Sequence, residues 1–330
     1  MKEINIKDKK IVYLDQNIWI GLSRVYYEKD ENLILKSILD KIIEASNSKN
    51  IIFPISIVNA RETLSRQNEE QKNRLVDFMI KVSKGYTISP YTEEFKKEEI
   101  KQAVLKKIGK PYEDLSKYVI KKGVSNLVGA EGEIIGNIPK NLKNTLLSLV
   151  NSEAGLNFIL RNPNSKISRN YEEDNKLITE LEKMRLENSK IKDNNRRYEE
   201  AIAKTVASLL TETQKICSEI GYNKPIFVNI PNSNINNREK VKEEIIQFFQ
   251  SIRATYTIFV LNYERDSQMQ RQINKNDLND IYSFAMSIPY CDIVVGEKMF
   301  IEIAKQSKLN KIYDTILLKS SNISELNKLL

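Results

Sequence analysis

Histidine is absent from the 330 residues of this chain. Its absence excludes histidine general acid–base catalysis, nucleophilic pairs that need an imidazole, and metal sites with histidine ligands. The two cysteines, Cys217 and Cys291, are too few for a zinc site or a disulfide framework, and they fit a reducing cytosol. Hydrolytic chemistry in such a chain must depend on carboxylates, Lys, Tyr or metal-bound water.

Long apolar runs are also missing. No stretch of about 18 apolar residues occurs, and the charged start lacks the apolar core of a signal peptide. We therefore expect a cytoplasmic protein with no membrane partner. The chain carries 52 Lys+Arg against 44 Asp+Glu, a formal charge of +8, which favours polyanions such as nucleic acid but is also compatible with background composition.

The hydrophobic residues, 41% of the chain, follow two periods. Short β-branched runs typical of buried strands alternate with amphipathic helical stretches. Strands are expected at 11–14, 51–54, 86–89, 291–295 and, at an edge, 311–313. Helices are expected from Ile18, over 33–42, from the N-cap Ser56, and over 68–84, 171–220, 239–272, 277–287, 300–306 and 324–330. Residues 255–261 also have strand propensity.

From Pro90 to about residue 240 the pattern is mostly helical and polar, whereas both ends of the chain alternate between strand and helix. The sequence therefore predicts an α/β fold with a parallel sheet flanked by helices. Residues 1–90 and 241–330 would build this domain, and residues 91–240 would form a large all-helical insertion.

Acidic residues follow the expected strands or begin the expected helices. Asp15 ends the first strand, at the edge where open α/β sheets place ligand sites, although a helix-capping role is about as common for such an acid. Glu62 follows Ser56 by six positions and is otherwise a solvated helix residue. Glu297 lies just past the strand 291–295, whereas Asp292 at the strand's start should point to the opposite pole.

Two more acids begin the helix 277–287. Asp277 fits an N-cap and Asp280 fits the third helical position, so both can be explained by stabilisation of the helix start. Asp280 lies 17 residues before Glu297, a separation that suits a helix and a returning strand. We rank Asp280 above Asp277 and Glu297 above Asp292 as candidates for a shared site.

Together, Leu14-Asp15-Gln16-Asn17, the Ser56 and Glu62 pair, Asp280 and Glu297 resemble the motifs of the PIN-like (PilT N-terminal-like) nucleases. The resemblance covers roughly the first and the last 90 residues. Two positions depart from the family pattern: Gly296 stands where Ser or Thr is usual, and the final acid is Glu where Asp is commoner.

The resemblance implies a carboxylate cluster of Asp15, Glu62, Asp280 and Glu297, with Asp277 as a fifth acid, that holds Mg²⁺ or Mn²⁺. Oxygen-only ligands suit these ions. It further implies a metal-dependent nuclease, an endoribonuclease in preference to a DNA-directed enzyme, of a family that often serves as toxins or in anti-phage defence. Candidate substrate contacts are Asn17, Arg265, Arg271 and Lys298, which lie near the acids in sequence.

Two other functions remain open. The chain can be a nucleic-acid- or protein-binding module on a PIN-like scaffold that has lost catalysis, in which the helical insertion does the binding; the Gly296 departure is the sequence support for it. It can also be a structure-specific nuclease that acts on branched DNA. A homodimer or a cognate regulatory protein would be compatible with each of these functions.

Overall fold

The computed structural model of this protein describes residues 8–48, 50–129, 139–162, 171–227, 235–268 and 272–330. The chain divides into two units. The first unit contains Met1–Pro90, Ser116–Tyr171 and Tyr282–Leu330, and the second contains Tyr91–Leu115 and Glu172–Ile281. These units differ from the expected domains in two places, because residues 116–171 lie with the chain ends and residues 241–281 lie with the helical middle.

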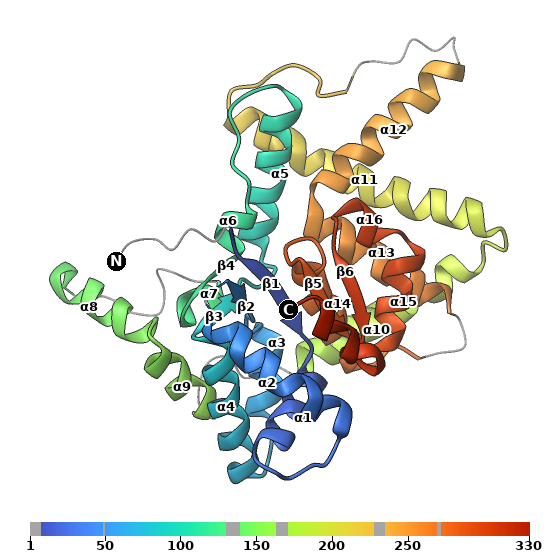
Figure 1. Cartoon of the computed structure of the whole chain (residues 1–330). Coiled ribbons are helices and arrows are strands. Elements are labelled where there is room, and N and C mark those ends of the chain that lie inside the picture. Colours follow the sequence, from blue (N-terminus) through green and yellow to red (C-terminus); the bar gives the residue numbers. More distant parts are fainter. Residues whose placement is uncertain (1–7, 49, 130–138, 163–170, 228–234, 269–271) are drawn as a thin grey trace. The chain divides into compact units, whose positions relative to one another are not determined.

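Strands from the two ends of the chain lie side by side in the first unit (Figure 1). The sheet has the order β2-β1-β5-β6, and every neighbouring pair is parallel. Its strands are β1 (Lys10–Leu14), β2 (Ile51–Ile52), β5 (Ile293–Gly296) and β6 (Ile316–Lys319). Leu14 pairs with Val295, so β1 and β5 end at the same edge. The expected α/β fold with a helix-flanked parallel sheet is confirmed.

A second, smaller sheet adjoins the parallel one. β3 (Tyr86–Ile88) pairs antiparallel with β4 (Ile120–Lys122), a strand that the sequence did not predict. The Ile88 N–H donates to the Ile55 carbonyl, and the Ile55 N–H donates to the Tyr86 carbonyl, both at 3.0 Å. β3 is therefore tied to the segment that follows β2.

The first unit also contains helices, and those that contact its parallel sheet bury an apolar stripe against it. The helices of this unit include α1 (Gln16–Tyr26), α2 (Leu33–Asn47), α3 (Ile57–Leu64), α4 (Glu69–Ser83), α6 (Ser116–Val119), α7 (Val124–Val128), α8 (Lys140–Val150), α9 (Glu153–Arg161), α15 (Lys298–Gln306), α16 (Leu309–Ile312) and the 3₁₀ helix η2 (Ser320–Lys328). Val12, Leu14 and Val295 pack on Trp19 and Phe78 in one core cluster. Every strand residue from Val12 to Leu14 is fully buried.

The end of the chain differs from expectation at two elements. Residues 311–313, expected as an edge strand, fall on and just after α16, and the edge strand is β6 instead. Positive φ angles at Lys308 and Asp314 bracket that turn of helix. The closing helix is η2, which begins at Ser320 rather than Ser324.

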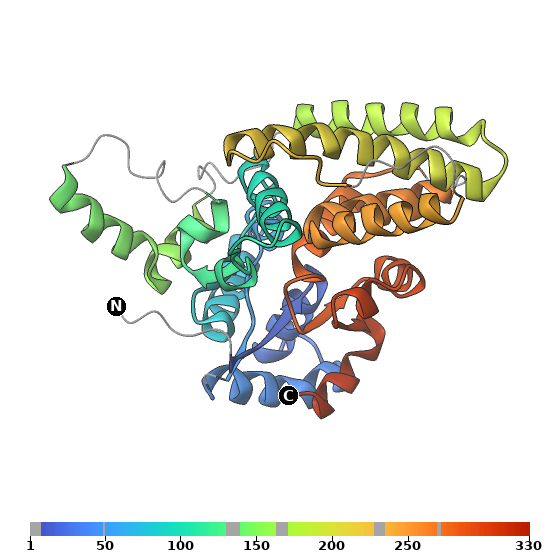
Figure 2. The same cartoon turned by 90° about the horizontal axis from the view of Figure 1, so that it is seen from above.

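The second unit is helical in the part of the chain that the structure describes (Figure 2). It contains α5 (Glu93–Lys107), most of α10 (Tyr171–Ser189), α11 (Asn194–Glu219), α12 (Ile235–Ser251), α13 (Arg253–Ser267) and the start of α14 (Lys275–Ser287). Residues 255–261 are helical despite their strand propensity, and Tyr256 packs edge-on to Phe249 at 5.1 Å between ring centres. None of the described helices combines the length and apolar character that a membrane span needs.

Candidate active site

Asp15 sits where the central strand β1 turns into α1. Its own N–H donates to the Val295 carbonyl at 2.9 Å, which continues the ladder between β1 and β5 by one residue. Its carboxylate accepts the Gln16 N–H at 2.8 Å, so Asp15 is the N-cap of α1. The capping role considered for this residue is therefore real, and it fixes the side chain at the carboxyl end of the sheet.

Glu297 occupies the corresponding place after the neighbouring strand β5. It precedes α15, and the Ile301 N–H donates to its carbonyl at 3.1 Å. No hydrogen bond of its side chain caps this helix, and the residue is exposed. Since β1 and β5 are adjacent and parallel, Asp15 and Glu297 emerge at the same edge of the sheet.

Glu62 reaches the same region from α3. Ser56 is the N-cap of α3, as predicted, and forms a reciprocal pair with Asn59: the Asn59 N–H donates to Ser56 Oγ at 3.1 Å and the Ser56 N–H to Asn59 Oδ1 at 3.0 Å. The Gln16 side chain donates from Nε2 to Thr63 Oγ1 at 3.0 Å. This buried bond joins the residue after Asp15 to the residue after Glu62, and sequence reasoning did not foresee it.

The electrostatics of Asp15 show which acids share its surroundings. The pKa of Asp15 is raised from its ordinary value of 3.8 to about 7, above all by burial. The Gln16 N–H acts against this rise, and the charges of Glu62 and Glu297 add to it. Asp15 is 7% exposed. A buried carboxylate beside two other acids is costly as an anion unless a cation compensates it.

Tyr13 is buried two residues before Asp15, on the face of β1 opposite to Val12 and Leu14. Its hydroxyl lies 3.2 Å from Ser56 Oγ, which links β1 to the cap of α3. Burial and the charge of Asp15 raise the pKa of Tyr13, so its neutral form is favoured. No sequence pattern singles out Tyr13, because a strand tyrosine is ordinarily a core residue.

Asp277 and Asp280 lie on the part of α14 that belongs to the second unit. The Asp277 N–H donates to Asn274 Oδ1 at 3.0 Å, and the Asn274 N–H donates to Asp277 Oδ2 at 2.9 Å. Asn274 is therefore the N-cap of α14, and Asp277 is its third helical residue. The helix thus begins three positions earlier than predicted. Asp277 is 1% exposed and closes a capping box. Asp280 is half-buried, one turn before Ser283 on the same helix.

Asp292 lies at the other end of the sheet, as its place at the start of a strand predicts. Its Oδ2 accepts the Ile11 N–H at 2.6 Å, and its own N–H donates to the Ile11 carbonyl at 2.9 Å. Since Ile11 begins the buried part of β1 and Asp15 follows its end, Asp292 is at the pole opposite to Asp15. It closes the sheet's amino end and is separate from the candidate site.

Gly296, the departure from the PIN-like pattern, has a packing reason. A Cβ at this position would lie 2.4 Å from Cζ and 2.6 Å from Cε1 of Phe284. The Phe284 ring is fully buried and packs on Phe300 at 6.0 Å between ring centres. The space that a Ser or Thr side chain would need is therefore filled by an aromatic ring from α14.

The candidate substrate contacts separate into three groups. Asn17 and Lys298 are exposed at the first turns of α1 and α15, next to the acids of the same edge. Arg265 is 3% exposed in the second unit, and its Nη2 lies 2.7 Å from Asp266 Oδ1. This pair holds the guanidinium inside, away from a ligand surface. Arg271 lies outside the described residues.

The structure therefore brings Asp15, Glu62 and Glu297 to one edge of the first unit. Within the described ranges, no three acid side chains stand close enough to form a ready-made metal site. The oxygen-only donor set still fits Mg²⁺ or Mn²⁺, because Asp15 is buried with a single hydrogen-bond donor and two acids nearby. No protein-family model, curated protein or solved structure matches the chain.

Proposed function

We propose that this chain is a PIN-like, metal-dependent nuclease that hydrolyses phosphodiester bonds, with RNA favoured over DNA as substrate. The observation that supports this proposal best is the buried carboxylate of Asp15, whose pKa is raised to about 7 by burial and by Glu62 and Glu297. The RNA preference and a role as a toxin or in anti-phage defence rest on the resemblance of the motifs alone.

In this proposal Asp15, Glu62 and Glu297, all of the first unit, hold Mg²⁺ or Mn²⁺. Asp277 belongs to the cap of α14, because its N–H donates to Asn274 Oδ1 and its Oδ2 accepts the Asn274 N–H. When bound, a divalent cation supplies activation of water and stabilisation of the charge on the attacked phosphate. Asn17 and Lys298, exposed beside the acids, would orient the phosphodiester.

A non-catalytic binding module is the second candidate. It is favoured because no three acids among the described residues lie close enough together to bind one metal ion. Gly296 no longer supports it, because the ring of Phe284 explains the glycine. The two candidates agree on the position of Asp15 and differ on turnover.

Incubation of the purified chain with labelled single-stranded RNA, single-stranded DNA and branched DNA, each with Mn²⁺ or with EDTA, separates these functions. We expect cleavage of RNA that needs Mn²⁺ and stops in EDTA. Preference for branched DNA would identify the structure-specific enzyme instead. Binding of the RNA with no cleavage in Mn²⁺ would identify the non-catalytic module and end the nuclease proposal.

A further inference from the structure

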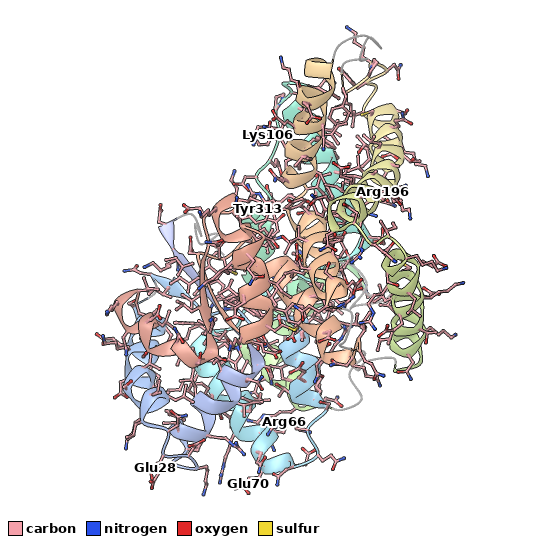
Figure 3. The ribbon with its side chains drawn as sticks, turned by 90° about the vertical axis from the view of Figure 1, so that its right-hand side faces the viewer. Glu28, Arg66, Glu70, Lys106, Arg196 and Tyr313 are labelled. Atoms are coloured by element: carbon pink, nitrogen blue, oxygen red, sulfur yellow. The ribbon has the colours of Figure 1, made fainter. Side chains whose placement is uncertain are left out.

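A basic pocket opens in the first unit, away from the acids. It has a volume of about 310 Å³ and lies between the end of α1 and the start of α4. Its lining includes four cationic side chains and one acid: Arg24, Lys29, Arg66, Arg74 and Glu70. Figure 3 labels Arg66, just after α3, and Glu70, in the first turn of α4. Four positive charges against one negative charge give the pocket a net charge that favours an anion.

Two of the four cations already have partners. Arg74 pairs with Glu70, and its guanidinium carbon lies 5.8 Å from the ring centre of Tyr27. Arg66 donates from Nη2 to Gln71 Oε1, a neutral acceptor, at 3.4 Å. The pair of Arg74 with Glu70 neutralises one positive charge, so three positive charges remain.

The other two cations, Arg24 and Lys29, form no ion pair with any acid of the described ranges. A cation in the last turn of α1 is favourable to the helix dipole, which gives Arg24 an ordinary structural explanation. That explanation does not apply to Lys29, which follows the helix. The acids next to Lys29 in sequence, Glu28 and Asp30, do not line the pocket.

The chain is bent in a way that brings Lys29 back to Arg24. Glu28 has φ of 55°, a conformation that favours glycine. The Lys29 N–H donates to the Arg24 carbonyl at 2.8 Å, and the Glu28 N–H donates to the Val25 carbonyl at 3.0 Å. These two bonds form a Schellman motif, which is usually closed by glycine at the position of Glu28. A non-glycine residue there costs of order 1 kcal/mol, and the result is two unpaired cations beside one pocket.

The pocket also has a fixed relation to the acids of the same unit. Asp15 caps the start of α1 and Arg24 lies nine residues further, which is about 13.5 Å along a helix. Glu62 lies on α3, and Arg66 follows four residues later. The α1 segment and the α3 segment therefore each carry an acid of the candidate active site and, further along the chain, a cation of the basic pocket.

We propose that the pocket of Arg24, Lys29 and Arg66 binds a backbone phosphate of single-stranded nucleic acid, at a distance from the phosphodiester that is cleaved. This inference rests on the proposed nuclease function for its choice of polyanion. Guanidinium and ammonium groups without acid partners are the usual phosphate ligands of proteins. A strand held here would approach the acids along α1 without a base-specific contact.

The test compares Arg24→Ala/Lys29→Ala with Lys305→Ala/Lys311→Ala. Each double variant removes two exposed lysine or arginine charges from the first unit, and only the first pair lines the pocket. Binding of a labelled single-stranded RNA, and of DNA with the same sequence, is measured by fluorescence anisotropy in EDTA over a range of salt concentrations. Because no turnover is needed, the measurement does not depend on the cleavage chemistry.

We expect the pocket variant to bind about tenfold more weakly at moderate salt, with a salt slope smaller by about 0.7, the contribution of one phosphate contact on a single strand. The control variant should stay within about twofold of the wild type. Losses on both RNA and DNA would support a backbone contact, and a loss on one alone would assign the pocket to that nucleic acid.

Equal affinity and slope in the wild type and the pocket variant would overturn the inference, as would the absence of any binding by the wild type. An equal loss for a polyglutamate probe would overturn it in favour of an acidic protein ligand. If the wild type cleaves RNA in Mn²⁺ but the pocket variant binds as tightly as the wild type, the nuclease proposal stands and the phosphate-binding role of the pocket is rejected. If binding is weaker in the pocket variant but the wild type cleaves nothing, the role of the pocket stands and the nuclease proposal is rejected.

Discussion

The two ends of the parallel sheet use aspartate in opposite ways. At the amino end, Asp292 is exposed and accepts the Ile11 N–H at 2.6 Å, which closes the start of β1. At the carboxyl end, Asp15 is buried, accepts one N–H, and lies near Glu62 and Glu297, which raise its pKa together with burial. The first arrangement stabilises the fold, whereas the second costs stability when the carboxylate is ionised. This difference marks the carboxyl end as the place for a ligand.

The largest effect that tests this comparison is on catalysis. Asp15→Asn should lower Mn²⁺-dependent RNA cleavage by more than about 100-fold, because loss of a ligand costs more than the 10–100-fold typical for its supporting partners. Asp292→Asn, the same change at the other end of the sheet, should leave cleavage within about twofold. The rates are measured with labelled RNA at saturating Mn²⁺. Equal rates for Asp15→Asn and the wild type would remove Asp15 from the site.

A smaller effect, with opposite signs at the two ends, is expected for stability in EDTA. The carboxyl of Asp15 has an ordinary pKa of 3.8 and a folded pKa of about 7. Below about pH 3 both states hold the proton, and as the pH rises toward 7 the unfolded chain releases it first. Ionisation therefore lowers the wild-type free energy of unfolding, by about 2–4 kcal/mol at pH 8.

Asp15→Asn should consequently be more stable than the wild type at pH 8 and equal to it near pH 3, as measured by urea unfolding. Asp292→Asn should be less stable by about 1 kcal/mol at pH 8, since a charged acceptor is replaced by a neutral one. Added Mn²⁺ should raise the stability of the wild type more than that of Asp15→Asn. The same sign for both variants would contradict the contrast between the two ends.

The smallest effect concerns the glycine at the carboxyl end. Gly296→Ala would place a methyl group 2.4 Å from the Phe284 ring, and we expect a loss of about 1–3 kcal/mol from overpacking. Phe284→Leu in the same chain should recover part of that loss. A Gly296→Ala variant as stable as the wild type would show that the Phe284 ring is not the reason for glycine at position 296.

The sequence was informative where a local pattern and the fold agree. β1 and the position of Asp15 at its end were predictable, because an apolar run that ends on an acid and is followed by an amphipathic stretch is typical of a buried strand that leads into a helix. Ser56 was predictable as a cap because serine before a helical stripe has a local reason to be there. The expected place of Asp292 at the pole opposite to Asp15 followed from the direction of one strand, and its bond to the Ile11 N–H agrees with it. The ranking of Glu297 above Asp292 as a site residue stays a prediction.

The remaining features depend on partners far away in the chain. β4 is three residues long with two lysines, and it exists because it pairs with β3, more than 30 residues earlier. Residues 255–261 are helical because their rings pack on neighbouring helices, which outweighs propensity. The basic pocket brings Arg24 and Lys29, at and after the end of α1, close to Arg66, which follows α3, and no periodicity of the sequence predicts that proximity.

The account depends on one divalent cation bound at the carboxyl end of the sheet, and Mn²⁺ can be located directly by its anomalous scattering. Crystals of the wild type grown in EDTA and then soaked in MnCl₂ should show an anomalous peak in contact with the carboxylates of Asp15 and Glu297. The peak should be missing in Asp15→Asn and present in Asp292→Asn. A soaked wild-type crystal with no peak at Asp15, or with its peak elsewhere, would contradict the account.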